Sequence, residues 1–399
     1  MKPVYYLGPQ GSFTHQAAVT AAQMLCSASV GVAMSADATV STVNSNNTDL
    51  GAVNSTDNTN INTASNDKSN DNEPQLVAAS DVPAIMDAVQ RGDAWGVIAW
   101  ENNVEGFVVP NLDMLIDSRD AVGFARVGVD IAFDAFIHPN DGGRDLRGAT
   151  VSAHSHGLAQ CKTFIAENKL TPVPATSNAA ACRDLAPGSV ALGPSMCGSL
   201  YGLTTFASGV QDYQGAHTEF LVIAPRNEAR AMLDVARRDG VNEFETIITF
   251  IPLVTGPGVL ADLLDVLRDA GLNMASFISR PIKGNDGTYS FIATIDAAPW
   301  QPRFRNVLMN IASHGDWVKT LAVYPRRERP SPPVDAWMLP QGGMRIDTTR
   351  VYSAQLPATG TSTGGMSTDG EPSDTPLSNS EPSIVSLLAT PEAERELLW

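Results

Sequence analysis

Thr218 is the residue of this sequence best placed to do chemistry. It lies in the segment Gly-Ala-His-Thr-Glu-Phe at residues 215–220, directly before an apolar run at 220–224. A Thr hydroxyl at the start of a strand can donate a hydrogen bond to a ligand, although most such residues only pack or satisfy backbone groups. Three more segments, at 8–14, 101–106 and 154–162, place Gly or polar residues after predicted strands. Since open α/β sheets bind ligands at the carboxyl ends of their strands, we expect these segments to form one site.

Predicted strands and helices alternate over residues 1–225. Strands are predicted at 4–7, 95–100, 149–153, 189–193 and 220–224, and helices at 15–26, 81–92 and 111–117. This alternation favours a largely parallel α/β architecture with a cleft between two lobes. Residues 246–324 then give the order strand, helix, strand, strand, helix, strand, which is the βαββαβ pattern of ferredoxin-like domains.

Two folded domains and two segments of different composition follow from this pattern. We expect one domain at 1–226 and a second at 245–326. Residues 41–74 are dense in Asn, Ser, Thr and Asp, and such composition predicts a disordered insertion. The tail at 327–399 is rich in Pro, Ser, Thr and Gly, so we expect it to be mostly disordered, with a short helix within 381–399.

Composition excludes several classes of function. The net charge of -17 disfavours a nucleic-acid partner, because phosphate binding needs clustered Lys and Arg. No apolar run approaches the ~18–20 residues that span a bilayer, and the first residues do not read as a signal peptide. A cytoplasmic protein with reduced thiols is therefore expected, since the four Cys are widely spaced. His154 and His156 lack a carboxylate or thiol at a matching spacing, so no metal site is predicted.

Five motifs in this order give the chain a resemblance to prephenate dehydratases followed by an ACT domain. Together with the βαββαβ region, they cover residues 3–326 apart from the insertion at 41–74. The motifs are Leu-Gly-Pro-Gln-Gly-Ser-Phe at 7–13, Glu101-Asn102 with Gly106, His154 with Gln160-Cys161, 191–193 with 200–203, and Thr218-x-Phe220. In the second domain, Gly258-Val259-Leu260 and Ser279-Arg280-Pro281 match the two segments that the family associates with phenylalanine binding.

The resemblance implies a reaction and a set of site residues. The family converts prephenate to phenylpyruvate with loss of water and carbon dioxide, and it needs no metal or organic cofactor because the ring becomes aromatic. Its fold is a two-lobed, periplasmic-binding-protein-like catalytic domain joined to a ferredoxin-like ACT domain. Thr218 corresponds to the catalytic Thr, which would hydrogen-bond the departing oxygen. The residues that would bind substrate are Ser12, Thr14, Glu101, Asn102, His154, Ser177 and Phe220.

The resemblance also implies regulation and assembly. L-phenylalanine would bind the ACT domain and inhibit the enzyme by preferring its less active state. The residues expected at this second site are Gly258, Val259, Leu260, Ser279, Arg280 and Pro281. Because ACT domains pair through their sheets and helices, we expect a homodimer or a homotetramer.

Glu219 is the main departure from the family pattern, which usually reads Thr-Arg-Phe. A carboxylate ~5 Å from a substrate carboxylate would repel it by about 3 kcal/mol at an effective dielectric of ~20. Further departures are Asn103, Ser155-His156, Ala216 and Ile278. The cations that would compensate are His15, His156, His217 and Lys162; otherwise catalysis is weakened.

Two alternative functions remain open at this point. An arogenate dehydratase would accept an ammonium in place of the side-chain keto group, and Glu219 would suit that charge. A non-catalytic aromatic amino-acid sensor would keep the cleft or the ACT domain as a binding site without turnover.

Overall fold

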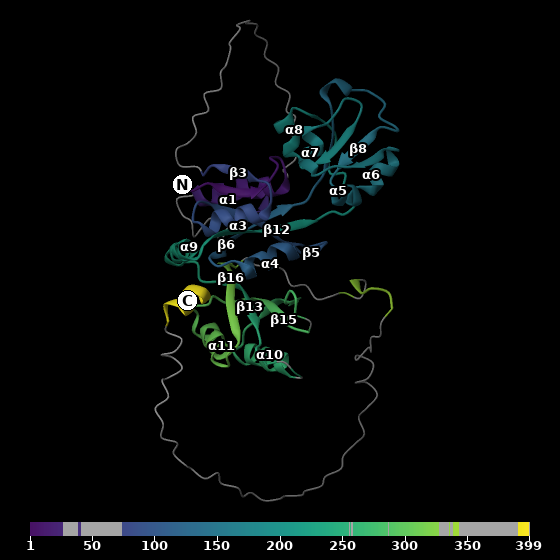
Figure 1. Ribbon diagram of the computed structural model, residues 1–399. Helices are drawn as coiled ribbons and strands as arrows, with labels where there is room; N and C mark the ends of the chain where they lie inside the picture. Colours follow the sequence, from purple (N-terminus) through teal and green to yellow (C-terminus); the bar gives the residue numbers. More distant parts are fainter. Residues whose placement is uncertain are drawn as a thin grey trace, which may run out of the picture. The chain divides into compact units, whose positions relative to one another are not determined.

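The computed structural model describes residues 1–26, 39–40, 74–254, 256, 258–285, 287–326, 335, 338–342 and 390–398 (Figure 1). The predicted insertion, except its last residue, and most of the predicted tail lie outside these residues. The described residues up to 326 and those at 390–398 belong to one compact unit, which is the part described below. None of the described helices is long and apolar enough to cross a membrane.

The first lobe is a sheet with the spatial order β6-β12-β4-β1-β3. β1 runs parallel to β3 and β4, whereas β12 runs antiparallel to both β4 and β6. The expectation of a largely parallel sheet is therefore wrong at β12, and the periodicity did not predict β3 or the long strand β6. The strands are β1 (Val4–Leu7), β3 (Leu76–Ala79), β4 (Trp95–Asn102), β6 (Ala121–Asp130) and β12 (His217–Pro225), with short pairings from β2 (Thr39–Val40) and β5 (Gly106–Phe107).

Helices cover both faces of this sheet, and β12 has different neighbours on each. Phe220 and Val222 pack with α1 and α9, whereas Leu221 and Ile223 pack with α3 and α4. Successive side chains of a strand point to opposite faces, so even-numbered and odd-numbered residues of β12 meet different surroundings. The helices are α1 (Phe13–Cys26), α3 (Val82–Gln90), α4 (Val109–Asp117) and α9 (Arg226–Arg238).

The second lobe is a five-stranded sheet with the order β11-β7-β10-β8-β9. The chain enters it from β6 and returns from β11 to β12, so both connections meet neighbouring strands of the first sheet. Figure 1 shows its helices grouped around β8. The elements are β7 (Asp134–Ile137), η1 (Pro139–Asp141), β8 (Thr150–Ala153), α5 (Ser155–Gln160), α6 (Lys162–Glu167), β9 (Thr171–Pro174), α7 (Asn178–Arg183), β10 (Val190–Gly193), α8 (Met196–Tyr201) and β11 (Thr204–Ala207).

Residues 244–325 have the predicted βαββαβ order. The four strands have the order β14-β15-β13-β16 and pair antiparallel throughout. Two helices cover one face, and Phe250, Phe304 and Leu308 belong to the core between helices and sheet. We call this region the ferredoxin-like domain; its elements are β13 (Phe244–Ile251), α10 (Val259–Asp269), β14 (Met274–Pro281), β15 (Tyr289–Ile295), α11 (Pro302–Ser313) and β16 (Trp317–Pro325).

The ferredoxin-like sheet continues directly into the sheet of the first lobe. β16 runs parallel to β6, with Ala322 paired to Gly123. A Cβ at Gly123 would lie 2.7 Å from the Cβ of Ala322, so this approach requires glycine. Lys319 of β16 donates from Nζ to the carbonyls of Leu115 (3.1 Å) and Ile116 (2.8 Å) near the end of α4. The two sheets are therefore joined by one close backbone contact and by side chains.

The last described residues form the helix α13 (Pro391–Leu397), which confirms the predicted short helix within 381–399. Thr390 caps its start by accepting a hydrogen bond from the N–H of Ala393. The buried Arg226 of α9 donates to the carbonyl of Glu396 (3.0 Å), and Thr320 of β16 donates to that of Leu397 (3.1 Å). This part of the predicted disordered tail is therefore packed on the folded unit.

Candidate active site

Thr218 lies near the start of β12, directly opposite Asn102 of β4. The Nδ2 atom of Asn102 donates to the Oγ1 atom of Thr218 over 2.9 Å. The Oδ1 atom of Asn102 accepts from the N–H groups of Val104 and Glu105, both over 2.9 Å. These two donors fix the orientation of the amide, because they require its oxygen. Thr218 therefore accepts the hydrogen bond from Asn102, and its own proton is not used in this contact.

Asn103 holds the segment that leads into β12. Its Oδ1 atom accepts from the N–H of His217 (2.7 Å), and its Nδ2 atom donates to the carbonyl of Gly215 (2.8 Å). Its own N–H donates to the carbonyl of His217 over 3.0 Å. In the sequence, Asn103 stands out as a departure from the family pattern. The signal for its structural role was its position directly after Asn102, at the end of a strand.

Glu219 lies on the opposite face of β12 from Thr218. Its carboxylate lies 3.2 Å from Nε2 of His217 and 3.4 Å from Nε of Arg126 in β6. Arg126 also reaches Glu245 of β13 over 3.1 Å. Asp130 lies 2.9 Å from Nδ1 of His217. We call these five residues the charge cluster: Arg126, Asp130, His217, Glu219 and Glu245. Glu219 is therefore engaged by protein groups, and the expected repulsion of substrate by this carboxylate does not follow from its position.

Arg126 and His217 carry the positive charge of this cluster. The side chain of Arg126 is 2% exposed. Burial opposes its charge, yet the neighbouring Tyr324, Glu219 and Glu245 outweigh this effect and raise the pKa of Arg126. The pKa of His217 is raised chiefly by its hydrogen bond to Glu219, against a smaller opposing effect of burial. Both groups thus favour their charged forms.

The first turn of the chain is organised around Ser12 and His15. The Oγ atom of Ser12 accepts from the N–H of His15 (3.1 Å) and caps α1. The N–H of Gly11 donates to Nδ1 of His15 over 3.0 Å, and burial lowers the pKa of this ring. His15 is therefore held neutral, and the expectation that it compensates for Glu219 as a cation is wrong. Thr14 follows Ser12 in the first turn of the same helix.

The second lobe touches the first at this turn and at the residues after β4. Cys197 of α8 donates from Sγ to the carbonyl of Gly11 (3.3 Å), and the hydroxyl of Tyr201 donates to the carbonyl of Gln10. Glu105 lies 3.3 Å from both Gln160 and His156 of α5. Of the segments predicted to meet, 101–106 therefore contacts 154–162, whereas 8–14 contacts α8 of the second lobe. No disulfide bond joins the four cysteines, all of which are among the described residues.

His154 and Ser177 both cap helices of the second lobe. His154 accepts at Nδ1 from the N–H of His156, and its own N–H donates to Oδ1 of Asn178 over 2.9 Å. Ser177 accepts at Oγ from the N–H of Ala180 over 3.0 Å. No group of three or more His, Cys, Asp or Glu within the described residues is arranged to hold a metal ion.

Two more predicted substrate-binding residues lie on β4 and β12. Glu101 pairs directly opposite Glu219, which places it beside the charge cluster. Phe220 is 2% exposed and belongs to the core that includes α1. We therefore expect Phe220 to act by holding β12 in place rather than by contact with substrate.

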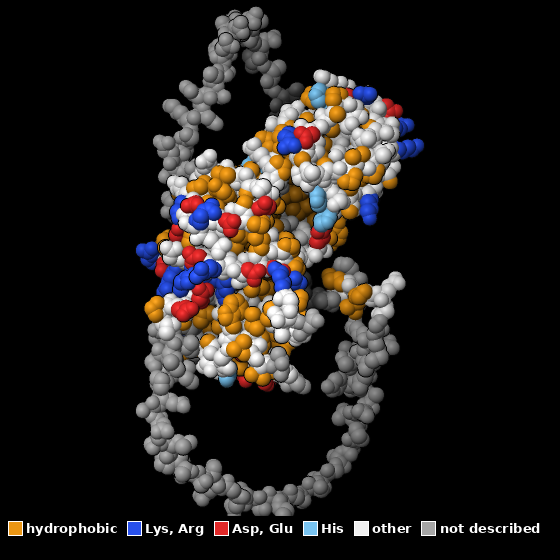
Figure 2. All heavy atoms as spheres, in the orientation of Figure 1, with side chains coloured by type: hydrophobic (Ala, Val, Ile, Leu, Met, Phe, Trp, Pro, Cys, Tyr) orange, Lys and Arg blue, Asp and Glu red, His pale blue; other side chains and the backbone are white. Residues whose placement is uncertain are grey.

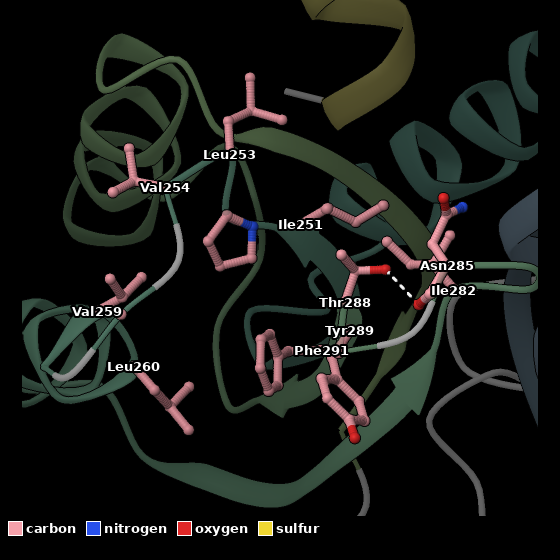
Figure 3. Close-up of a pocket in the computed structure, with 13 residues that line it drawn as sticks. Ile251, Leu253, Val254, Val259, Leu260, Ile282, Asn285, Thr288, Tyr289 and Phe291 are labelled. Carbon is pink, nitrogen blue, oxygen red and sulfur yellow. Dashed lines mark hydrogen bonds between the residues drawn. The ribbon is translucent and has the colours of Figure 1, made fainter.

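A pocket of about 460 Å³ opens in the ferredoxin-like domain (Figure 3). Val259 and Leu260, two of the residues predicted to bind phenylalanine, line it from the start of α10, and Phe291 lines it from β15. Gly258 precedes α10 with a φ of 97°, a conformation that favours glycine. The other predicted segment does not line this pocket: Arg280 instead forms an ion pair with Asp113 of α4 over 3.3 Å.

Comparisons with known proteins agree on one family. The prephenate dehydratase family profile matches residues 58–228. A prephenate dehydratase from Mycolicibacterium gilvum is 31% identical over 220 residues, which cover 54% of this chain and 68% of that protein.

Solved structures share the fold. A prephenate dehydratase from Arthrobacter aurescens, in complex with L-Phe, aligns with a TM-score of 0.60 at 21% identity, over 84% of this chain and 94% of that one. A structure described as a quorum-quenching acylase, GqqA, aligns with a TM-score of 0.58 at 17% identity, over 81% and 98%. Since differently described proteins share this fold, the reaction is assigned from the family match and not from the fold.

Proposed function

We propose a mechanism for this chain, which belongs to the prephenate dehydratase family. The chain has the family's hydro-lyase activity, which makes phenylpyruvate. In the proposed mechanism Thr218 donates a hydrogen bond to the hydroxyl group that leaves prephenate. The observation that carries this role is the bond from Asn102 to Thr218 Oγ1. Because Thr218 is the acceptor in that bond, its proton is available where negative charge develops on the departing oxygen.

The first turn of α1 is proposed to bind a carboxylate of the substrate. Ser12 starts this 14-residue helix, whose amino-terminal end carries a partial positive charge. Thr14 adds a hydroxyl in the same turn. Contacts between this turn and α8 support a position between the two lobes. Asn102, His154 and Ser177 are proposed to complete the site around the substrate, whereas Glu101 pairs with Glu219 and lies on the other face of the sheet.

Arogenate is the less favoured substrate. That alternative needed Glu219 as a partner for the ammonium group of the substrate. Glu219 instead contacts His217 and Arg126, on the face of β12 opposite Thr218. Competition between prephenate and arogenate in one assay would measure the preference directly.

The proposed role of Thr218 is tested by substituting its hydroxyl. Thr218→Ala should lower kcat for phenylpyruvate formation by about 10²- to 10³-fold, the usual cost of one lost transition-state donor. Thr218→Ser keeps the hydroxyl and should retain most of the activity. The matched control is Thr205→Ala, which removes a hydroxyl from the exposed side chain of a Thr in β11. A Thr218→Ala enzyme within threefold of wild type would disprove the assignment, and a reaction without enzyme corrects for spontaneous breakdown.

L-phenylalanine is proposed as the inhibitor, with the ferredoxin-like domain acting as an ACT domain. The pocket has a size typical of small-molecule sites, and mainly apolar side chains line it. Figure 3 shows Leu260 and Phe291 at its wall, which suits an aromatic side chain. The L-Phe complex of the Arthrobacter aurescens structure is consistent with this ligand.

Titration calorimetry can show which of the two predicted phenylalanine-binding segments binds L-Phe. Leu260→Ala should weaken L-Phe binding by about 10-fold, since it removes a methine and two methyl groups from a half-buried side chain at the wall of the pocket. Arg280→Gln, on the segment outside the pocket, is the control and should bind L-Phe as wild type does. The opposite result would place the site at Ser279, Arg280 and Pro281.

Assembly as a homodimer or homotetramer is proposed to involve the ferredoxin-like domain. Four large apolar side chains of this domain are exposed: Leu253, Val254, Tyr289 and Trp317. Figure 2 shows hydrophobic side chains gathered on this part of the molecule. Light scattering across a range of concentrations would reveal the oligomer, and a monomer at all concentrations would refute it.

A further inference from the structure

The charge cluster links the strand that carries Thr218 to the ferredoxin-like domain. Arg126 lies on β6, and its guanidinium contacts Glu219 of β12 on one side and Glu245 of β13 on the other. In the sheet order, β16 lies between β6 and β13. The Arg126 side chain therefore reaches past β16, and its guanidinium lies over the ring of Tyr324 at 4.9 Å from the centroid.

The backbone pairing of β6 with β16 is short. Their pairing has a single register pair, Ala322 with Gly123, whereas β6 and β12 pair along nine residues of β12. β12 thus moves with β6, and the link from β6 to the ferredoxin-like domain depends strongly on side chains. Arg126 is one such side chain, and the carboxylate it contacts on β12 belongs to the residue directly after Thr218.

We propose that Arg126 is a positioning residue for the dehydratase reaction, acting on Thr218 through Glu219. Two carboxylates, Glu219 and Glu245, share this one guanidinium, and their side chains are only 15% and 4% exposed. Without the cation the two buried carboxylates repel each other, and Glu219 turns away from β6. The backbone at Thr218 then shifts with its neighbour, and the hydroxyl leaves the geometry that Asn102 sets. This inference rests on the proposed role of Thr218 and not on inhibition by L-Phe.

Steady-state kinetics with prephenate test the inference. Arg126→Met should lower kcat between about 10- and 100-fold, because displacements of about 1 Å in a catalytic group have effects of this size. KM should stay within about threefold, since Arg126 does not contact substrate. Arg126→Lys keeps the charge and should recover part of kcat, which loss of packing alone would not predict.

A double-substitution cycle separates positioning from general destabilisation. Glu219→Gln removes the negative charge from the same contact at a less buried position on β12, so it serves even if Arg126→Met does not fold. Glu219→Gln should lower kcat as well, and the double variant should lose less than the product of the two single losses. The matched control is Arg226→Met, which removes an equally buried Arg that contacts Glu396 and Thr320 instead. It should lower the Tm but leave kcat within about twofold.

The outcomes are distinct. The inference is overturned if folded Arg126→Met or Glu219→Gln keeps the wild-type kcat, if only KM changes, or if Arg226→Met lowers kcat equally. Thr218→Ala is measured in parallel. If Thr218→Ala keeps full activity, the proposed role of Thr218 fails together with the positioning that depends on it. If Thr218→Ala is inactive while the Arg126 and Glu219 variants are fully active, only the positioning role fails.

Discussion

Exchange of Asn102 for Asp reverses the polarity of the contact to Thr218 with almost no change of shape. The Oδ1 atom of the introduced carboxylate still accepts from the N–H groups of both Val104 and Glu105, so the turn after β4 keeps its hydrogen bonds. The contact to Thr218 Oγ1, at 2.9 Å, loses its donor. The Thr hydroxyl then donates to the carboxylate, and its proton is no longer available to the departing oxygen.

The size of the effect follows from the loss of one donor. A donor aimed at a developing negative charge contributes about 10²–10³ in kcat, or about 2.7–4 kcal/mol. Asn102→Asp should therefore lower kcat nearly as much as Thr218→Ala does. Thermal stability should fall much less than in Asn102→Ala, which also leaves the N–H groups of the turn without their acceptor.

The assay is phenylpyruvate formation at saturating prephenate, measured over a range of pH. At neutral pH Asn102→Asp should be nearly inactive. As the pH falls toward the pKa of the introduced carboxyl, its protonated form donates again, so activity relative to wild type should rise. An Asn102→Asp enzyme within threefold of wild type at neutral pH, or a ratio independent of pH, would refute the proposed direction of this hydrogen bond.

Three further predictions concern the rest of the described structure. Gly123→Ala should destabilise the protein by about 1–3 kcal/mol in urea unfolding, because its Cβ meets Ala322 at 2.7 Å, and adding Ala322→Gly should restore most of this loss. Because Glu219 raises the pKa of His217, the contribution of His217 is fully present below its unfolded pKa of about 6.5 and is lost as the pH rises through the folded pKa. The stability difference between wild type and His217→Gln should therefore be larger near pH 6 than near pH 9, and a constant difference would contradict it. Burial raises the pKa of Cys161 to about 12, so iodoacetamide at about pH 8 should label this thiol only after unfolding, as read by peptide mass spectrometry.

Periodicity predicted the ferredoxin-like domain better than the centre of the first sheet. In residues 244–325 each strand and helix keeps its own apolar spacing, and the predicted order is confirmed. β6 is different: nine of its ten residues are buried, so its sequence does not alternate between exposed and buried side chains. A strand buried on both faces cannot be recognised from period two. The signal that could have drawn attention to it was Arg126, the one charged residue within the apolar run before Asp130.

The motifs predicted which segments form the candidate site, but they did not predict the directions in which the side chains point. Thr218 and Asn102 followed from the motifs, and the structure pairs them directly. The role of Glu219 was misjudged because neighbours in sequence were treated as neighbours in space. Strand geometry alone separates them, since adjacent side chains point to opposite faces. What no local pattern contains is the partner from another strand, here Arg126, because that contact depends on the order of strands in the sheet.

The charge of Glu219 has two opposing effects, an attraction to Arg126 and a repulsion of the substrate carboxylate. At 3.4 Å from Arg126, and with an effective dielectric of ~20, Glu219 has a bare Coulomb attraction of about 5 kcal/mol. The repulsion estimated for a substrate carboxylate at ~5 Å was about 3 kcal/mol, and it falls further because Glu219 lies on the other face of β12. The attraction therefore exceeds the repulsion. A carboxylate following Thr218 is compatible with an anionic substrate as long as Arg126 holds it, which is why the Arg126 variants are the decisive ones.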